Sequence, residues 1–195
     1  GKGPGIFEVN GLRVGLSVCE DIWHENVIKQ LHEKKTDLIL NINASPFHLD
    51  KIKERKVLIS GHAINYSLPI VYANQVGGQD ELVFDGTSMA MDGEGQQILQ
   101  LEKFKEDYKI VNFTSDQEGK LSSEKREEIP EDKELEEVYK ALVLGAKDYI
   151  QKNNFPGVLI GSSGGIDSAL TAAIAADAIG PEKVRTFMLP FKFTS

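Results

Sequence analysis

The sequence has a single cysteine, fewer basic than acidic residues and no long apolar segment. Cys19 is the only cysteine among 195 residues, so no disulfide can form within the chain. Lysine and arginine number 22 against 30 acidic residues, and the net charge of −8 disfavours a nucleic-acid-binding protein, which needs a basic face. No apolar run is long enough to cross a bilayer, and no segment has the pattern of a signal peptide. We therefore expect a cytoplasmic protein without a membrane or nucleic-acid partner.

The first part of the chain has the pattern of an α/β protein. Leu12, Val14, Leu16 and Val18 occupy alternate positions, as in a strand. Residues 37–42 are almost continuously apolar, as in a strand covered on both faces. The other elements predicted here are helices over 26–34 and 50–68, strands over 69–73 and 108–113, and a hairpin of 89–91 with 97–101 around Asp92–Gly93.

A polar, charged segment over residues 115–133 follows and is predicted to be a solvated linker. Beyond it, apolar residues at spacings of three and four predict an amphipathic helix over 135–150. The elements predicted next are a strand over 157–160, a glycine-rich loop, a helix over 167–179 and a strand over 184–189. Strand, helix and strand in this order predict a parallel pair with a right-handed crossover.

The glycine-rich loop, Ser163-Gly164-Gly165-Ile166-Asp167-Ser168, lies between a predicted strand and a predicted helix. The first N–H groups of a helix lack partners and favour an anion, and glycines allow a phosphate to approach the backbone closely. Asp167 is an unexpected neighbour for a phosphate unless Mg²⁺ lies between them. The alternative is a serine-capped helix after a tight turn, with Asp167 stabilising the helix dipole.

This loop resembles the SGGxDS loop of the ATP pyrophosphatase family, which adenylates a carboxyl or carbonyl oxygen and releases pyrophosphate. The resemblance implies that Ser163, Gly164, Gly165, Ile166 and Ser168 bind the phosphates of ATP and that Asp167 binds Mg²⁺. Unlike a Walker loop, it has no lysine after the glycines. The motif alone leaves several members of the family open.

Cys19 ends a predicted strand, where its thiol can project into a cleft beside backbone N–H groups. A lone cysteine after such a strand is more often a small buried apolar residue. However, residues 11–23 resemble the nucleophile segment of the carbon–nitrogen hydrolase (nitrilase) family, which attacks amides with a Glu–Lys–Cys triad. By this resemblance Cys19 is the nucleophile and the Glu20 N–H helps to form the oxyanion hole. The glutamate and lysine of that family lie far upstream of the cysteine and are not in this chain.

Three further segments resemble the glutamine-dependent NAD⁺ synthetase family. Residues 43–48, followed by Lys51 and Arg55, resemble its glutamine-binding part and imply Ser45 and Arg55 as glutamine ligands. Residues 72–86 resemble a long loop of that family, although by composition they read only as a surface loop. The tail over 188–195 resembles the family's next segment, except that Phe191 replaces the usual serine.

The combination of an amidase segment with an SGGxDS loop favours this family. It implies an α/β fold with the C-terminal part of a nitrilase-like αββα sandwich over 1–114, a linker over 115–133, and over 134–195 the first βα unit of a Rossmann-like (adenine nucleotide α hydrolase) parallel-sheet domain. It implies a ligase that takes ammonia from glutamine and amidates nicotinic acid adenine dinucleotide with ATP and Mg²⁺. We expect an internal fragment of a homo-oligomeric enzyme. The alternatives are a stand-alone amidase and a catalytically incomplete piece.

Overall fold

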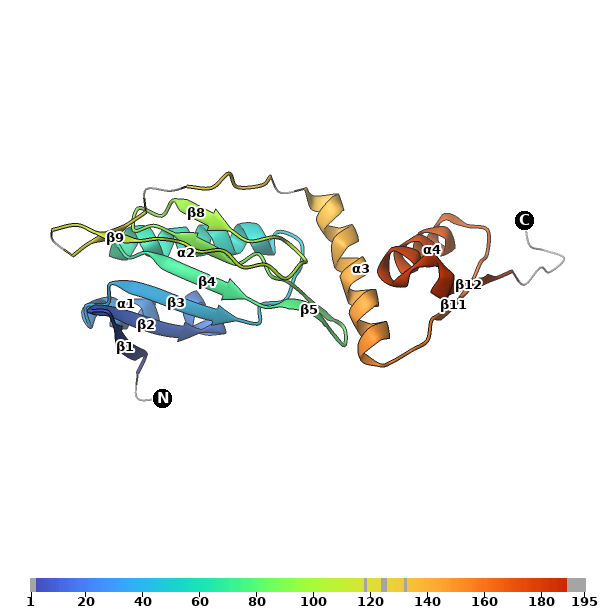
Figure 1. Cartoon of the computed structure of the whole chain (residues 1–195), viewed down its shortest axis with the longest axis horizontal. Coiled ribbons are helices and arrows are strands. Elements are labelled where there is room, and N and C mark those ends of the chain that lie inside the picture. Colours follow the sequence, from blue (N-terminus) through green and yellow to red (C-terminus); the bar gives the residue numbers. More distant parts are fainter. Residues whose placement is uncertain (1–2, 118, 124–125, 132, 189–195) are drawn as a thin grey trace. The chain divides into compact units, whose positions relative to one another are not determined.

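The computed structural model describes residues 3–117, 119–123, 126–131 and 133–188 (Figure 1). The chain divides into two units, one formed by Gly1–Val76 with Phe84–Asp132 and the other by Gly77–Val83 with Lys133–Ser195. Within the described ranges, no helix is both long enough and apolar enough to cross a membrane.

The first unit is built on a six-stranded sheet in the order β1-β2-β3-β4-β7-β8. The central strands β2, β3 and β4 are parallel, and the outer pairings are antiparallel. The strands are β1 (Gly5–Val9), β2 (Leu12–Val18), β3 (Leu38–Asn43), β4 (Ile70–Asn74), β7 (Met89–Met91) and β8 (Gln97–Gln100). Strand β1 was not predicted from the sequence, and it is fixed by backbone pairing with β2.

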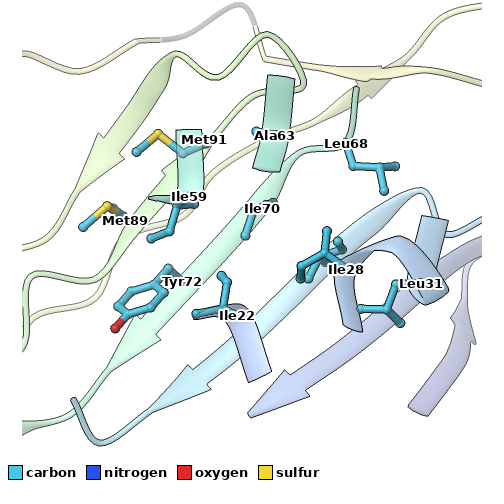
Figure 2. Packing of buried hydrophobic residues seen from close by; sticks show 11 residues of the cluster. Ile22, Ile28, Leu31, Ile59, Ala63, Leu68, Ile70, Tyr72, Met89 and Met91 are labelled. Atoms are coloured by element: carbon cyan, nitrogen blue, oxygen red, sulfur yellow. The ribbon is translucent and has the colours of Figure 1, made fainter. Parts of the chain in front are cut away.

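Helices α1 (Glu25–Glu33) and α2 (Lys51–Tyr66) cover one face of this sheet. Ile28 and Leu31 of α1 and Ile59 of α2 are fully buried against Ile70 and Tyr72 of β4 (Figure 2). Each buried aliphatic side chain contributes about 1.5–3 kcal/mol relative to an exposed one. This core fixes the carboxyl ends of the parallel strands, where the candidate site lies.

An irregular segment covers part of the opposite face. The predicted strand over 108–113 is wrong, because these residues form no regular structure. Val111 and Phe113 pack against buried residues of β7 and β8, whereas Tyr108 and Ile110 are 87% and 79% exposed. Residues 108–113 therefore form an extended segment that covers the sheet with one side and is not itself a strand of the sheet.

Part of the predicted linker lies against the first unit. Strands β9 (Thr114–Ser115) and β10 (Leu121–Ser122) form a short antiparallel pair, and Leu121 is buried. Further on, the Glu127 N–H donates to the Ile98 carbonyl at 3.0 Å, and its carboxylate lies 2.6 Å from the Lys109 ammonium. The Glu127 carboxylate raises the pKa of Lys109. At least one residue of the acidic run is thus paired rather than only solvated.

The second unit contains a parallel β-α-β arrangement. Its elements are α3 (Glu134–Lys152), β11 (Val158–Gly161), α4 (Ile166–Ile179), the short 3₁₀ helix η2 (Pro181–Lys183) and β12 (Val184–Phe187). Strands β11 and β12 pair in parallel, as predicted, with α4 between them in the chain. The α/β fold class is therefore confirmed, while the tail beyond Met188, with Phe191, lies outside the described residues.

A hairpin interrupts the first unit and contributes its tip to the second. Strands β5 (Val76–Gln79) and β6 (Leu82–Asp85) pair with each other, where the sequence indicated only a surface loop. The Gly78 N–H donates to the Asp148 carboxylate at 2.8 Å, and the Lys152 ammonium donates to the Gly78 carbonyl at 2.5 Å. Gly78 permits a close approach to α3, since a Cβ there would lie 3.2 Å from the Gly145 Cα.

Candidate functional site

Cys19 lies at the first residue after β2, where the chain turns into the 3₁₀ helix η1 (Cys19–Trp23). Its φ of +49° is in the left-handed region, which non-glycine residues rarely adopt outside special turns and functional sites. The Asp21 carboxylate accepts a hydrogen bond of 2.9 Å from the Val18 N–H and fixes the turn. Glu20 lies in the first turn of η1, where N–H groups have no acceptor inside the helix. The half-buried Cys19 thiol thus has the backbone setting of a nucleophile beside an oxyanion donor.

Helix α2 holds this turn from one side. The His62 ring Nε2 donates to the Ile22 carbonyl at 2.8 Å, which gives the histidine a structural role. The Lys51 ammonium lies 3.9 Å from the centre of the Trp23 ring, within cation–π range. Lys51 also pairs with Glu54 at 3.3 Å. These contacts hold η1, the turn that begins at Cys19, against the start and middle of α2.

Ser45 follows β3 at the same edge of the sheet, because the carboxyl ends of parallel strands meet there. Its backbone is held on both sides. The Asn74 side chain accepts from the Ser45 N–H at 2.8 Å and donates to the Ser45 carbonyl at 3.2 Å. The buried Ser45 hydroxyl receives one further hydrogen bond, from Arg55 Nε at 3.2 Å. Ser45 is therefore a preformed hydroxyl position.

Arg55 is fully buried and uses its whole guanidinium inside the protein. Two hydrogen bonds of 2.9 Å connect it to the two carboxylate oxygens of Asp85, which is itself fully buried. Its other bonds go to the Ser45 hydroxyl, the Ser45 carbonyl at 2.8 Å and the Pro46 carbonyl at 3.1 Å. Thr87 Oγ1 completes the network by donating to Asp85 at 2.5 Å. Since an arginine has five N–H donors, none is left over for a ligand in this arrangement.

The glycine-rich loop joins β11 to α4 in the second unit. Gly165 is the N-cap of α4, and no side chain in the described part of the chain caps it. The Ser163 and Ser168 hydroxyls lie 3.3 Å apart, and Ser168 donates to the Gly165 carbonyl at 2.9 Å. Gly164 has φ +82°, and nothing lies within 4 Å of where a Cβ would stand. The loop therefore presents glycine backbone, two hydroxyls and the start of a 14-residue helix to open space.

Asp167 is exposed at the first turn of α4. A single carboxylate fits the usual Mg²⁺ site for phosphates, in which one or two carboxylates and the substrate supply the ligands. Within the described residues, no group of three or more histidine, cysteine or acidic side chains could hold a metal ion by itself.

Sequence reasoning missed Asp85, Asn74 and Tyr72 as members of the Cys19 and Ser45 surroundings. Asp85 is 30 positions from Arg55, and nothing in a single sequence pairs two residues at that distance. The available signal was the unusual presence of asparagine at strand ends, in Asn43 and Asn74, because asparagine is depleted from strands.

Comparisons with known proteins match two parts of the chain to two families. Residues 1–121 match the carbon-nitrogen hydrolase family, and residues 138–195 match the NAD synthase family. The glutamine-dependent NAD(+) synthetase of Acinetobacter baylyi is 40% identical over 190 residues, which are 97% of this chain and 35% of that protein. The protein of the same name from Aquifex aeolicus is 37% identical and aligns with 100% of this chain and 40% of its own length.

A solved structure of a protein of the same name also matches the whole chain. The glutamine-dependent NAD+ synthetase of Acinetobacter baumannii, in complex with ADP, superposes with a TM-score of 0.92 at 45% identity, over 100% of this chain and 36% of that one. The chain thus spans between about a third and two fifths of the length of these relatives. Through residues 1–121 the chain belongs to the carbon–nitrogen hydrolase family, and it continues into an NAD synthase segment over residues 138–195.

Proposed function

We propose that this chain is part of a glutamine-dependent NAD⁺ synthetase, a ligase with two active sites. The observation that carries the proposal is that one chain has both an amidase-type Cys19 turn and an SGGxDS loop at the start of α4. We propose domains over 1–114 and 134–195, with the connecting segment 115–133 lying against the first. A single free thiol suits the cytoplasm, and exposed apolar side chains on α2, Val57 and Ile64, suit a homo-oligomer.

The first site releases ammonia from glutamine. The Cys19 thiolate attacks the side-chain amide carbon, and the Glu20 N–H stabilises the negative oxygen that forms. The carbon–nitrogen bond breaks, ammonia leaves, and a thioester to Cys19 remains. Water then attacks the thioester, so that glutamate and the free thiol are formed. The glutamate and lysine that complete a nitrilase-type triad come from outside this chain.

Ser45 binds the α-amino or α-carboxylate group of glutamine, and Arg55 supports it. The Ser45 backbone is fixed by Asn74 and Arg55, while its hydroxyl proton is free to reach a ligand. The donors of Arg55 are directed at Ser45, Pro46 and Asp85, so the role of Arg55 in glutamine binding is exerted through Ser45.

At the second site, the carboxylate of nicotinic acid adenine dinucleotide is adenylated by ATP, pyrophosphate leaves, and ammonia then displaces AMP to give NAD⁺. The loop residues Ser163, Gly164, Gly165 and Ile166 bind the phosphates through N–H groups and hydroxyls, and Ser168 adds a hydroxyl from the first turn of α4. Asp167 is the candidate ligand for Mg²⁺, which would neutralise phosphate charge when bound.

The test uses Cys19→Ala in a full-length enzyme that carries this chain. The variant should lose NAD⁺ formation from glutamine and keep NAD⁺ formation from added ammonium salts. The two rates are measured side by side in wild type and variant. If the ammonia-driven rate falls as far as the glutamine-driven rate, the two-site proposal is wrong. Glutamate release that does not respond to ATP and yields no NAD⁺ would favour a stand-alone amidase.

A further inference from the structure

Tyr72 lies on the same face of the sheet as the candidate glutamine site, two residues before the end of β4. In the register of the sheet it stands opposite Asn41 of β3, which in turn stands opposite Ser17 of β2. The next inward-facing residues toward the strand ends are Asn43 and Asn74, which also stand opposite each other. Figure 2 shows the Tyr72 ring in the core with its hydroxyl directed toward the end of β4. The phenol therefore extends from the apolar core toward the edge where Ser45 lies.

The hydroxyl of Tyr72 is buried without a partner. The residue is 1% exposed, and among the described residues no atom forms a hydrogen bond of normal geometry with its oxygen. Burial has the largest effect and raises the pKa of the phenol, while the Arg55 charge and the Ser45 hydroxyl, which lies within hydrogen-bonding reach, lower it. The phenol therefore keeps its proton at neutral pH and has the Ser45 hydroxyl within reach.

An unbonded buried hydroxyl is a cost to folding, since it has left water without a replacement partner. Phenylalanine would fill the same space without that cost. Buried polar groups without partners are rare in native proteins and require an explanation, of which a functional role is one. The position of this hydroxyl beside Ser45 suggests what the role is.

We propose that Tyr72 is a positioning residue for glutamine, whose hydroxyl bonds to Ser45 Oγ when that serine turns to hold the substrate. The inference rests on the proposed function. Ser45 Oγ accepts only the Arg55 Nε–H bond at 3.2 Å, so it can accept a second hydrogen bond while it donates its own proton to the ligand. Two donors to one hydroxyl oxygen polarise it and strengthen the bond that it donates.

The experiment compares Tyr72→Phe with wild type in the full-length enzyme. Loss of one neutral hydrogen bond that forms only with substrate should raise the KM for glutamine about three- to tenfold. The kcat with glutamine should change less than twofold, and ammonia-driven NAD⁺ formation should not change. The thermal midpoint should stay the same or rise, because an unbonded hydroxyl has been removed from the core. This pairing of weaker substrate use with undiminished stability is not expected of a merely structural tyrosine.

Tyr66→Phe is the matched control. Tyr66 ends α2 and packs against the same core, but its hydroxyl donates to Glu25 at 3.0 Å. This variant should lose a little stability and keep the wild-type KM for glutamine. A wild-type KM in Tyr72→Phe would overturn the inference, as would a fall in its thermal midpoint larger than that of Tyr66→Phe. If wild type itself forms no glutamate from glutamine, the proposed function fails first, and that result is distinct from both.

Discussion

At the scale of single residues, the Arg55–Asp85 pair shows how a buried charge can serve a site without contacting a ligand. Both side chains are almost completely buried, and the pair is bidentate. Removing one partner leaves the other charge buried and unpaired. We predict that Arg55→Ala lowers the free energy of unfolding by about 3–5 kcal/mol. Urea unfolding measures this loss.

Lys53→Ala is the control for that prediction. Lys53 pairs with Asp50 at 2.9 Å, but the two side chains are 58% and 61% exposed. Water and salt screen such a pair, so the loss should be below about 1 kcal/mol. Equal losses in the two variants would contradict the view that the Arg55 network is a structural support for Ser45.

Asp167 presents a different problem, because it stands where phosphate oxygens are expected. Two charges about 4 Å apart interact by roughly 4 kcal/mol at an effective dielectric near 20. The positive end of the helix dipole stabilises the carboxylate by only about 0.3–1 kcal/mol. We predict that Asp167→Asn keeps the fold and the glutaminase step but loses adenylation, through weaker productive binding of Mg·ATP.

The measurement is ATP–pyrophosphate exchange across a Mg²⁺ titration. If Asp167 only stabilised the start of α4, the substitution by asparagine would leave the exchange rate nearly unchanged, because asparagine is also a good capping residue. Wild-type exchange with wild-type Mg²⁺ dependence in the variant would therefore exclude the metal role.

At the scale of elements, two helical glycines should respond differently to alanine. A Cβ at Gly61 in α2 would meet nothing within 4 Å, so Gly61→Ala should raise the free energy of unfolding by about 0.5–1 kcal/mol. A Cβ at Gly145 in α3 would lie 2.9 Å from Val83 Cγ2 of the β5–β6 hairpin. We predict that Gly145→Ala does not raise the free energy of unfolding and that it weakens the packing of the hairpin tip against α3.

Hydrogen exchange at the Gly78 amide checks this prediction, since that N–H is bonded to Asp148 of α3. Exchange should become faster in Gly145→Ala and remain unchanged in Gly61→Ala. Slower or unchanged exchange in the α3 variant would show that the hairpin tolerates the added methyl group.

The elements also show what a single sequence can and cannot predict. Apolar spacing predicted β2 and α3, and a nearly continuous apolar run predicted β3, to within a few residues, because burial sets these patterns. The strand predicted over 108–113 was wrong because an extended chain that covers a sheet can have the same apolar composition as a strand. The hairpin over 76–85 was missed because its order depends on Asp148 and Lys152, far away in the sequence.

Some residues of the candidate site could be predicted from the sequence and others could not. Cys19, Ser45 and the loop over 163–168 could be identified from short motifs, since each lies in a contiguous segment. The partners that orient them could not. Asp85 reaches Arg55, and Tyr72 approaches Ser45, only after β3, β4 and β6 have assembled. A glutamine ligand role for Arg55 was the natural expectation for an arginine near Ser45, before its donors were accounted for.

At the scale of the whole molecule, residues 1–195 correspond to between about a third and two fifths of the length of the relatives they match. By the resemblance that identifies Cys19, the triad glutamate and lysine would precede residues 1–195, and a thiol without its base is a weak nucleophile at neutral pH. We predict that residues 1–195 expressed alone release no glutamate from glutamine. Glutamate release that disappears in Cys19→Ala would mean that a base within this chain has been overlooked.

Transfer of the amide nitrogen tests the central claim most directly. A full-length enzyme that carries this chain is given glutamine labelled with ¹⁵N in its side-chain amide, together with Mg·ATP and nicotinic acid adenine dinucleotide. If the Cys19 site supplies ammonia to the site at α4, the NAD⁺ formed carries the label in its carboxamide, as mass spectrometry would show. The account would be contradicted if glutamate is formed but NAD⁺ is either not formed or carries no label.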